Sequence, residues 1–548
     1  MKRFFLLLSA LLAIGASACT NFLVGKKASK DGATYVTYSA DSYGMYGNLP
    51  HFPAGTHAPG TMRRIIEGDT NRFLGEIPEA PVTYNVLGNI NEHQVAIVET
   101  TFGGREELAP KDPMGGIDYT SLMSLGLQRA RTAREAIRVM TDLVAKHGYS
   151  SSGESFSIAD PNEVWVLEMI GKGDEKKGAV WVAVRIPDDC IAAHANQSRI
   201  HKFDMKDKQN VMYAKDVIKF ARQKGYFSGK DADFSFSKAY SPADFGSQRF
   251  CDARAWSFFN RFVSGMERYI SFVDGRHLGD SDVMPLYFKP NSPLGLDDLM
   301  AGMRDHYEGT PFEFHNSLAG GVYAAPYQPS PLKWKHEGKE YFNERPISTQ
   351  QAGFVVVAQL RSWLPREVGG VLWFGNDDPN MVPFTPVYCS ATAAPKCYAE
   401  GTASDHEFSW DSAFCLQNWV SNMVYPRYEQ IFPVLKSKRD ELHQYYVKAL
   451  AASDQEAVAR LEKSREEGVQ FLTEQTRQYA DRMMQDWRKL GEHLIMKFND
   501  QVVKVQDADG KWQLTPDGIC VPPQRPGYPD AYRQKLIEKT GERFSVPQ

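Results

Sequence analysis

The sequence predicts an α+β protein whose strands form antiparallel sheets. Short strands rich in Val, Tyr and Thr occur in pairs with turn residues between them, as in residues 20–25 and 33–39 around Lys30-Asp31-Gly32. Strands joined by a tight turn run antiparallel. Helical stretches separate the hairpins, and a charged helical pattern follows residue 408. This alternation indicates sheets with a helical cover.

The composition is that of a large folded chain. The protein has 548 residues, of which 42% are hydrophobic and 12% aromatic, too much apolar material for a disordered or collagen-like chain. Lys and Arg number 63 against 67 Asp and Glu, a formal net charge of −4. Without a basic surplus, nucleic acid is not expected as the main partner.

The expected elements of the core follow in order. Residues 82–87 and 94–101 read as strands around a turn, Gly88-Asn89-Ile90-Asn91-Glu92. Helices are expected at 119–127 and 132–146, where Thr132 and Glu135 fit a capping box and Gly148 fits a helix stop. The remaining expected strands form further pairs: 155–159 with 164–169, 180–186 with 190–195, and 353–360 with 370–375.

The C-terminal region is expected to be helical. Ser453-Asp454-Gln455-Glu456 has the pattern of a capping box and predicts a charged helix from there to about Lys489. The Pro-rich end is expected to be either ordered through Cys520 or loose. We therefore divide the chain into a leader (1–18), a core (19–400), a helical extension (401–500) and a tail (501–548).

Residues 1–18 have the features of a secretory signal peptide. Lys2 and Arg3 supply the positive start, residues 4–14 are apolar, and Ala16-Ser17-Ala18 is a small-residue cleavage site. The apolar run is too short to span a bilayer, and the sequence contains no later run of about 18 apolar residues. We expect an exported protein, periplasmic or secreted, without stable membrane insertion after the leader is removed.

Export affects how the seven cysteines are expected to pair. In an oxidising compartment thiols tend to pair, so six could pair and one would be left over. Cys389 and Cys397, on either side of Ala394-Pro395, could close a small loop, and unpaired buried cysteines are the alternative. The sequence contains neither C-x-x-C nor H-E-x-x-H, so no zinc site is indicated.

Cys19 becomes the first residue of the mature chain if cleavage follows Ala18. One use of such a cysteine is lipidation. Lipoprotein signals usually have Leu three positions before the cysteine and a Ser/Gly/Asp-rich tether after it. Here Ala16 and the strand-like segment 20–24 stand in those places. A lipid-anchored binding protein therefore remains only as an alternative.

The other use of an N-terminal cysteine is catalysis. A thiol must lose its proton to become a nucleophile, and a free α-amine, with a pKa of about 7.7–8.0, can accept that proton. Cys19 would then carry nucleophile and base in one residue, and the amine would exist only after the bond to Ala18 is cut. The pattern favours an enzyme that is activated by removal of its leader.

From Cys19 onwards the residues resemble a known family. The opening Cys19-Thr20-Asn21-Phe22-Leu23-Val24-Gly25-Lys26-Lys27-Ala28-Ser29-Lys30-Asp31-Gly32 is similar to the start of the cysteine dipeptidases. These belong to the N-terminal nucleophile (Ntn) hydrolases, with choloylglycine hydrolase and penicillin V acylase among their relatives. Further similar blocks follow in order at 88–92, 164–168, 181–188, 194–199, 253–256 and 369–375. The resemblance spans most of residues 19–430.

The resemblance implies a four-layer αββα sandwich, with helices outside two antiparallel sheets, and amide hydrolysis through a thioester. Cys19 would be the nucleophile and, through its amine, the base. Asp41 matches an acidic residue that holds the cysteine and its amine, and Asn91 matches a position near the oxyanion site. Asn196 and Arg254 match polar residues that line the pocket.

One position departs from the family pattern. Each of the other candidate site residues except Cys19 also has an ordinary structural explanation. Relatives usually carry Arg where this chain has Tyr38, so the role of that arginine is lost or supplied from elsewhere. Asp41 could be a turn or cap acid, and Asn91 a hairpin residue. Asn196 begins a glycosylation pattern, and Arg254 could form an ion pair instead of binding a substrate carboxylate.

Together these observations predict an exported cysteine dipeptidase that acts on small peptides without a metal or an organic cofactor. An acylase of the choloylglycine or penicillin type is the alternative with the same chemistry. The sequence leaves the oligomeric state and the side-chain preference open.

Overall fold

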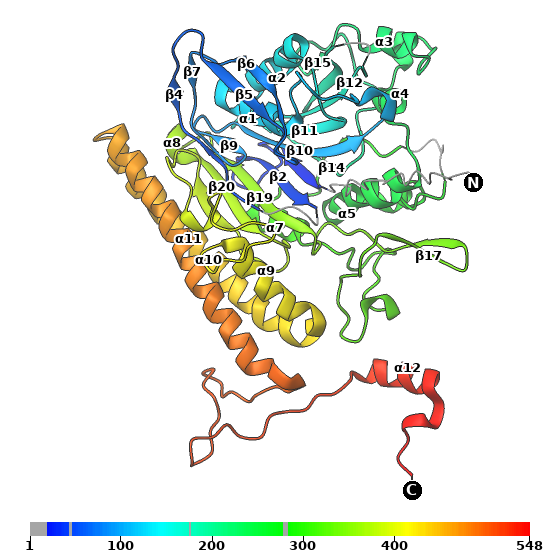
Figure 1. The fold of residues 1–548 in the computed structure, drawn as a ribbon, viewed down its shortest axis with the longest axis vertical. Helices are drawn as coiled ribbons and strands as arrows, with labels where there is room; N and C mark the ends of the chain where they lie inside the picture. Colours follow the sequence, from blue (N-terminus) through cyan, green and yellow to red (C-terminus); the bar gives the residue numbers. More distant parts are fainter. Residues whose placement is uncertain (1–18, 43–46, 175–176, 278–282, 548) are drawn as a thin grey trace, which may run out of the picture.

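Two antiparallel sheets form the centre of the computed structural model, which describes residues 19–42, 47–174, 177–277 and 283–547 (Figure 1). The predicted leader, 1–18, lies outside the described residues. In spatial order the first sheet contains β16 (Tyr287–Phe288), β14 (Ile191–His194), β1 (Asn21–Val24), β2 (Thr34–Asp41), β19 (Ala352–Leu360), β20 (Gly370–Asn376) and β21 (Thr385–Tyr388). The second contains β15 (Val211–Tyr213), β13 (Ala179–Ile186), β12 (Val164–Gly171), β11 (Gly153–Ala159), β10 (Ala96–Gly103), β9 (Ile90–Asn91), β8 (Val86–Leu87) and β3 (His51–Phe52).

The central strands are covered on both faces. Every residue of β2 and of β12 is buried, although neighbouring side chains in a strand point to opposite faces. Each strand therefore needs a packed layer on both sides. Strand β2 contacts β10, β11 and β12 of the second sheet, and it also contacts helix α7 (Leu296–Met303).

Helices pack against both sheets. Helix α1 (Tyr119–Arg129) contacts β10, and α2 (Ala133–His147) contacts β11, β12 and β13 of the second sheet. Helix α5 (Ala253–Phe262) contacts β14 of the first sheet. The predicted start and stop of α2 are confirmed, because Thr132 accepts a bond from the Glu135 backbone and Gly148 has a φ of +99°. The predicted α+β class with antiparallel sheets is confirmed.

Two strand predictions need correction. Residues 180–186 and 190–195 do not pair, because β13 belongs to the second sheet and β14 to the first. The turn Pro187-Asp188-Asp189 carries the chain between the sheets, and a turn signal gives the break without giving the partner strand. The segment 88–92 is more than a turn, since Ile90–Asn91 forms β9 between β8 and β10. The crossing matters for the site because it brings the end of β14 beside β1.

The C-terminal region is helical, as predicted, but its main helix boundary is elsewhere. The helices are α9 (Ala413–Val424), α10 (Tyr428–Leu461) and α11 (Arg465–Phe498). Ser453 lies inside α10, where its hydroxyl is 2.7 Å from the Tyr479 hydroxyl of α11. The true cap is Ser464, whose hydroxyl accepts a bond from the Glu467 backbone at 3.0 Å. Both serines begin an S-x-x-E pattern. Packing between the helices decides which of the two caps the start of a helix.

The tail leaves the body of the molecule (Figure 1). Its helix α12 (Asp530–Thr540) has no buried residue, and Cys520 is exposed without a disulfide, so it does not pin the tail. The predicted Cys389–Cys397 link is also wrong. Both are thiols, and Cys389 Sγ is directed at the Arg366 carbonyl, 3.5 Å away.

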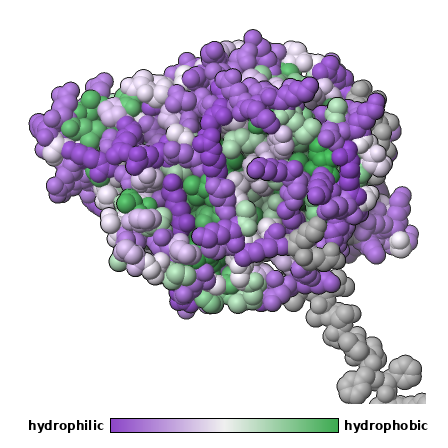
Figure 2. All heavy atoms as spheres, turned by 90° about the horizontal axis from the view of Figure 1, so that it is seen from above, coloured by the Kyte–Doolittle hydropathy of each residue, from purple (hydrophilic) through white to green (hydrophobic). Residues whose placement is uncertain are grey.

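The described helices include none that is both long and apolar enough to cross a bilayer. Figure 2 shows one face of the molecule, which is mostly hydrophilic with separate small hydrophobic groups.

Candidate active site

Cys19 lies two residues before the first residue of β1 and is fully buried. Thr20 and Ser39 exchange backbone hydrogen bonds of 3.3 and 3.0 Å, and continuing this antiparallel register places Cys19 opposite Ala40 of β2. On its other side β1 pairs with β14. Cys19 thus begins a strand that is held from both sides.

Asn196 and Arg254 hold the backbone of Cys19. Asn196 follows β14 with a φ of +63°, a conformation that Asn tolerates. Its Oδ1 accepts a bond from the Cys19 backbone nitrogen at 2.7 Å, and its Nδ2 donates to the Thr101 carbonyl at 2.8 Å, which fixes the amide orientation. Arg254 Nη1 donates to the Cys19 carbonyl and to Thr20 Oγ1, both at 2.7 Å.

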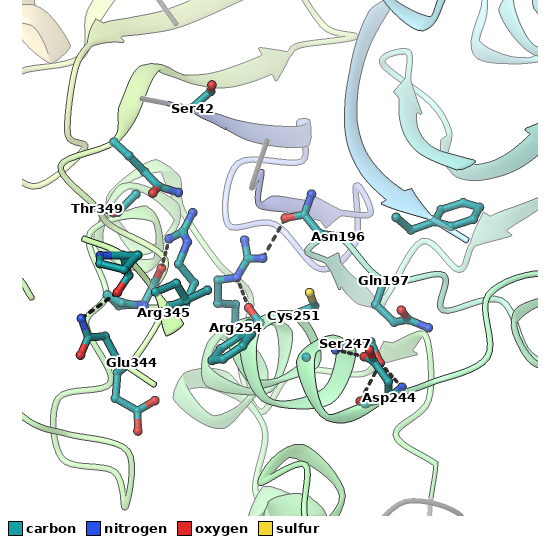
Figure 3. A pocket seen from close by; sticks show the side chains of 18 of the residues that line it. Ser42, Asn196, Gln197, Asp244, Ser247, Cys251, Arg254, Glu344, Arg345 and Thr349 are labelled. Carbon is teal, nitrogen blue, oxygen red and sulfur yellow. Dashed lines mark hydrogen bonds between the residues drawn. The ribbon is translucent and has the colours of Figure 1, made fainter. Parts of the chain in front are cut away.

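The guanidinium of Arg254 is fully engaged within the protein. Nε donates to the Phe250 carbonyl at 2.7 Å, and Nη2 donates to the Ala195 carbonyl at 3.1 Å and to Asn196 Oδ1 at 2.8 Å (Figure 3). With the two Nη1 bonds, all five donors of an arginine are in use. The suggested bidentate bond to a substrate carboxylate therefore has no donor left. Among the described residues Arg254 also forms no salt bridge, and its Nη1 bonds connect it to Cys19 and Thr20.

The thiol of Cys19 faces a tyrosine and a glutamate. Its Sγ lies 3.9 Å from Tyr38 Oη on β2 and 3.8 Å from Glu99 Oε1 on β10. Tyr38 Oη donates to the same Oε1 at 2.6 Å, a short bond typical of a hydroxyl and a carboxylate. Glu154 on neighbouring β11 is likewise buried, and its Oε1 accepts a bond from Thr101 Oγ1 at 2.9 Å.

Burial makes these two carboxyl groups weak acids. It raises the pKa of Glu99 to about 7, against hydrogen bonds from Tyr38 and Glu154 that lower it. Burial and the nearby charge of Glu99 raise the pKa of Glu154 well above its usual range. No Lys or Arg in the described part of the chain bonds to either glutamate. Both carboxyl groups therefore keep their protons to higher pH than a free glutamate does, as close carboxyl pairs do.

Asp41 ends β2 and pairs with an arginine from a distant loop. Arg345 Nη2 donates to Asp41 Oδ2 at 2.7 Å, and Ser39 Oγ donates to the same oxygen at 3.2 Å. Burial raises the pKa of Asp41, whereas the charge and the hydrogen bond of Arg345 lower it. Oδ1 is buried and has no hydrogen-bond partner among the described residues. That Asp41 holds the amine of Cys19 in place remains a prediction.

Asn91 is not brought to this group. Its Nδ2 donates to the carbonyls of Leu127 and Ala130 at 2.7 and 2.8 Å, at the end of α1. Its Oδ1 accepts bonds from the backbones of His93 and Val95, both at 3.0 Å. All its side-chain groups thus bind the protein itself, and the predicted place near an oxyanion remains a prediction. Asn91 anchors the β9 hairpin to α1.

A cavity of about 900 Å³ opens beside Asn196, Arg254 and Arg345 (Figure 3). A proline-rich segment, residues 326–332, forms part of its wall, and Cys251 contributes a thiol. Its other charged lining residues are Arg105, Glu107, Asp244 and Glu344. The described residues include no group of three side chains that could ligate a metal ion.

Comparison with known proteins identifies the family. The model of peptidase family C69 matches residues 18–58 and 48–441, well over half of the chain. The chain belongs to peptidase family C69. This confirms the predicted resemblance to the cysteine dipeptidases and the prediction of a peptide hydrolase of the cysteine type.

Curated relatives of this C69 peptidase agree with the family. A probable dipeptidase of Latilactobacillus sakei is 26% identical over 485 residues, which cover 85% of this chain and 92% of the relative. A probable dipeptidase of Salmonella dublin is 26% identical over 413 residues, covering 71% and 85%. A dipeptidase of Bifidobacterium longum is 26% identical over 410 residues, covering 67% and 71%.

Sequence reasoning missed three charged residues in this part of the C69 peptidase. Glu99 and Glu154 each lie in a strand whose other residues are apolar or small. A carboxyl group in a buried strand needs a bonding partner or a chemical function. Such a carboxyl group in an otherwise apolar strand could have been recognised in the sequence as a candidate site residue. Arg345 lies in a loop between Glu344 and Pro346, and nothing local distinguishes it from a surface arginine. Only the fold brings it to Asp41.

Proposed function

We propose that this C69 peptidase is an exported dipeptidase that cleaves its substrate through a thioester on Cys19. The observation that carries the proposal is the placement of Cys19 at the start of a buried strand. Its nitrogen is 2.7 Å from Asn196 Oδ1, its carbonyl is held by Arg254, and its thiol is beside Glu99. The names of the relatives, dipeptidase and probable dipeptidase, support the substrate class.

Removal of the leader would give Cys19 the groups that the reaction needs. While the bond to Ala18 exists, the nitrogen lone pair is delocalised into the peptide group and cannot accept a proton. Cleavage yields an α-amine with a pKa of about 7.7–8.0. One of its N–H groups would bond to Asn196 Oδ1, where the backbone N–H donates in the structure. The sulfur attacks the scissile carbonyl, the amine protonates the leaving nitrogen, and water hydrolyses the thioester.

The cavity suits a small substrate with charges of both signs. A volume of about 900 Å³ lies within the range of pockets that enclose small ligands. A dipeptide carries an ammonium and a carboxylate group close together. The cavity offers Arg105 as a cation and Glu344 as an anion, whereas Arg254 has no donor to contribute. These features support a zwitterionic dipeptide over a bulky acyl amide.

We also infer that sheets and helices stack as four layers. The contacts of α1 and α2 with the second sheet, of β2 with β10, β11 and β12, and of α5 and α7 with the first sheet support this order. Such stacking would place Cys19 in one of the two inner layers, away from bulk water.

Variants of Cys19 test the proposed function. We expect Cys19→Ala to abolish dipeptide hydrolysis and Cys19→Ser to lose at least ~10²-fold in kcat/KM, because a hydroxyl is a weaker nucleophile at neutral pH. Cys520→Ser, in the exposed tail, serves as the matched control and should keep full activity. Full activity of Cys19→Ala would overturn the proposal.

The mature N-terminus and the substrate class are tested on the same preparation. Mass spectrometry of the exported chain should find Cys19 as residue one with an unmodified amine. A diacylglyceryl adduct on Cys19 would instead indicate the lipid-anchored alternative. Dipeptides and N-acyl amides are assayed side by side, and a preference for the acyl amides would replace the dipeptidase by an acylase.

A further inference from the structure

A buried carboxyl group, Glu99, lies beside the Cys19 sulfur with a second one, Glu154, near it, and the mechanism above does not use them. Glu99 is fully buried, with Oε1 3.8 Å from Cys19 Sγ, and Glu154 is 1% exposed. Burying carboxyl groups without a cation is costly, and a core position of this kind is usually apolar. The position of Glu99 at the sulfur calls for a chemical explanation.

We propose that Glu99 is a catalytic residue that accepts the thiol proton of Cys19, and that Tyr38 and Glu154 are its positioning residues. The inference rests on the proposed role of Cys19 as nucleophile and deepens it. It assigns the thiol proton to Glu99 and leaves the α-amine to protonate the departing nitrogen.

The geometry singles out one oxygen of Glu99 as the acceptor. Oε1 lies 3.8 Å from Sγ, and Tyr38 Oη donates to the same Oε1 at 2.6 Å. The ring of Tyr38 is in turn held edge-on against Phe354 at a centroid distance of 5.4 Å. Catalytic hydrogen bonds are often long before substrate binds, so 3.8 Å is within the range from which such a bond shortens.

The charges around Glu99 explain why a proton acceptor is needed at this point. Two strands and the segment before β1 bring Tyr38, Glu154 and Cys19 to Glu99. The other groups that face it are Tyr119 on α1, Tyr149 before β11, and Asp69. Asp69 lies in the connection between β5 (Met62–Ile66) and β6 (Phe73–Pro78). All are acids or neutral hydroxyl groups. A thiolate formed here beside an ionised Glu99 would be repelled by that carboxylate.

Proton transfer from sulfur to Glu99 avoids this repulsion, because it leaves the net charge unchanged. The S–H bond breaks as an O–H bond forms on Glu99 Oε1, and the thiolate attacks the scissile carbonyl. The ammonium of Cys19 gives a proton to the leaving nitrogen as the C–N bond breaks. Water then gives one proton to the amine and its hydroxide to the thioester, and the released sulfur recovers its proton from Glu99. The cycle consumes one water and restores every group.

Glu99→Gln is the direct test, read as a pH profile of kcat/KM. The wild-type profile should be bell-shaped, with a lower limb near the Glu99 pKa of about 7 and an upper limb near the amine pKa of about 7.7–8.0. In Glu99→Gln only the neutral amine can take the thiol proton. We expect kcat/KM to fall ~10²-fold at pH 7 and the profile to become a single rise near the amine pKa.

Tyr38→Phe gives an independent variant that keeps the ring packing. Without the hydroxyl, ionised Glu99 loses a hydrogen bond, so its pKa rises and the lower limb should move to higher pH. Alkylation of Cys19 by iodoacetamide, followed on its peptide by mass spectrometry, reports the same titration without substrate. Its rate should rise near pH 7 in the wild type and at higher pH in both variants.

Glu168→Gln is the matched control. Glu168 is a fully buried carboxyl on β12 whose pKa burial also raises to about 7, but it bonds to Ser198, Arg199 and Ile200 and not to Cys19. It should lose stability with an unchanged pH profile. A bell-shaped profile and wild-type kcat/KM in Glu99→Gln would overturn the inference while leaving Cys19 as nucleophile. Activity in Cys19→Ala would overturn both.

Discussion

Single buried residues at the candidate site influence stability as well as chemistry. Burial raises the pKa of Glu99 from 4.5 to about 7, so the folded chain binds this proton more tightly than the unfolded chain. Below pH 4.5 both states hold the proton, and above pH 7 both have lost it. The free energy of unfolding should therefore fall by about 3 kcal/mol as the pH rises from 4.5 to 7 and stay lower above that.

Glu99→Gln should remove this part of the pH dependence, because a glutamine side chain does not ionise. Urea unfolding of both proteins between pH 4.5 and 8 measures the effect as a difference, which cancels the other titrating groups. The variant should gain stability over the wild type mainly between pH 4.5 and 7. A difference that stays constant over this range would show that Glu99 does not carry the shift.

The sequence could identify the site residues that belong to a recognisable sequence pattern. Cys19 follows a cleavage pattern, and Asn196 and Arg254 lie in blocks that resemble the family. Arg345 could not be found, because its task depends on Asp41, 304 residues away along the chain. The anchoring bonds of Asn91 to the end of α1 could not be predicted either, since a turn asparagine looks the same in the sequence whether it anchors a hairpin or binds a substrate.

Among the elements, the contact between α9 and α11 tests whether side-chain packing or helix propensity has the larger effect on stability. Gly491 lies inside α11, where alanine is intrinsically better for a helix by about 1 kcal/mol. A Cβ at this position, however, would lie 2.1 Å from the ring of Trp419 on α9. We expect Gly491→Ala to destabilise the protein by about 1–3 kcal/mol, because overpacking outweighs propensity.

Thermal unfolding of Gly491→Ala and of the control Gln485→Ala measures this. Gln485 is exposed on the same helix, so its replacement should leave the Tm nearly unchanged. Adding Trp419→Leu to Gly491→Ala should recover part of the loss, because the smaller side chain leaves room for the methyl group. A Tm increase in Gly491→Ala alone would contradict the packing argument.

Elements were easier to predict than their partners. Alternation and turn residues are local properties, and the strands around β1, β2, β11, β12, β19 and β20 lie where the sequence indicates. The pairing of β14 with β1 instead of β13 is a tertiary choice that no local pattern encodes. The same holds for Ser453 and Ser464, whose S-x-x-E patterns are equivalent until α10 and α11 pack together.

In the whole molecule, the candidate site exists only where distant segments meet. Cys19, Tyr38 and Asp41 come from the first sheet, Glu99 from the second, and Arg254 from α5. The bond between Arg254 and the Cys19 carbonyl spans 235 residues. Cys19 is therefore in place only after the core has folded, and none of the site residues named above comes from the described part of the tail beyond the helical extension.

The tail provides the test of this division. Residues 502–524 fold back on the end of α11, where Val503 pairs with Gln524 and Trp512 stacks on His493 at 5.5 Å. Beyond them α12 has no buried residue. Removal of 525–548 should therefore leave both kcat/KM and the Tm unchanged, because no apolar surface is uncovered.

Removal of 465–548 should have the opposite result. It deletes α11, whose buried side chains include Leu472, Tyr479, Met483 and Trp487. Each such side chain contributes about 1.5–3 kcal/mol on burial, and the sum approaches the whole stability of a typical domain. We expect this shorter chain to be insoluble. Loss of activity in the 525–548 deletion, with an unchanged Tm, would instead show that the tail reaches the cavity and takes part in substrate binding.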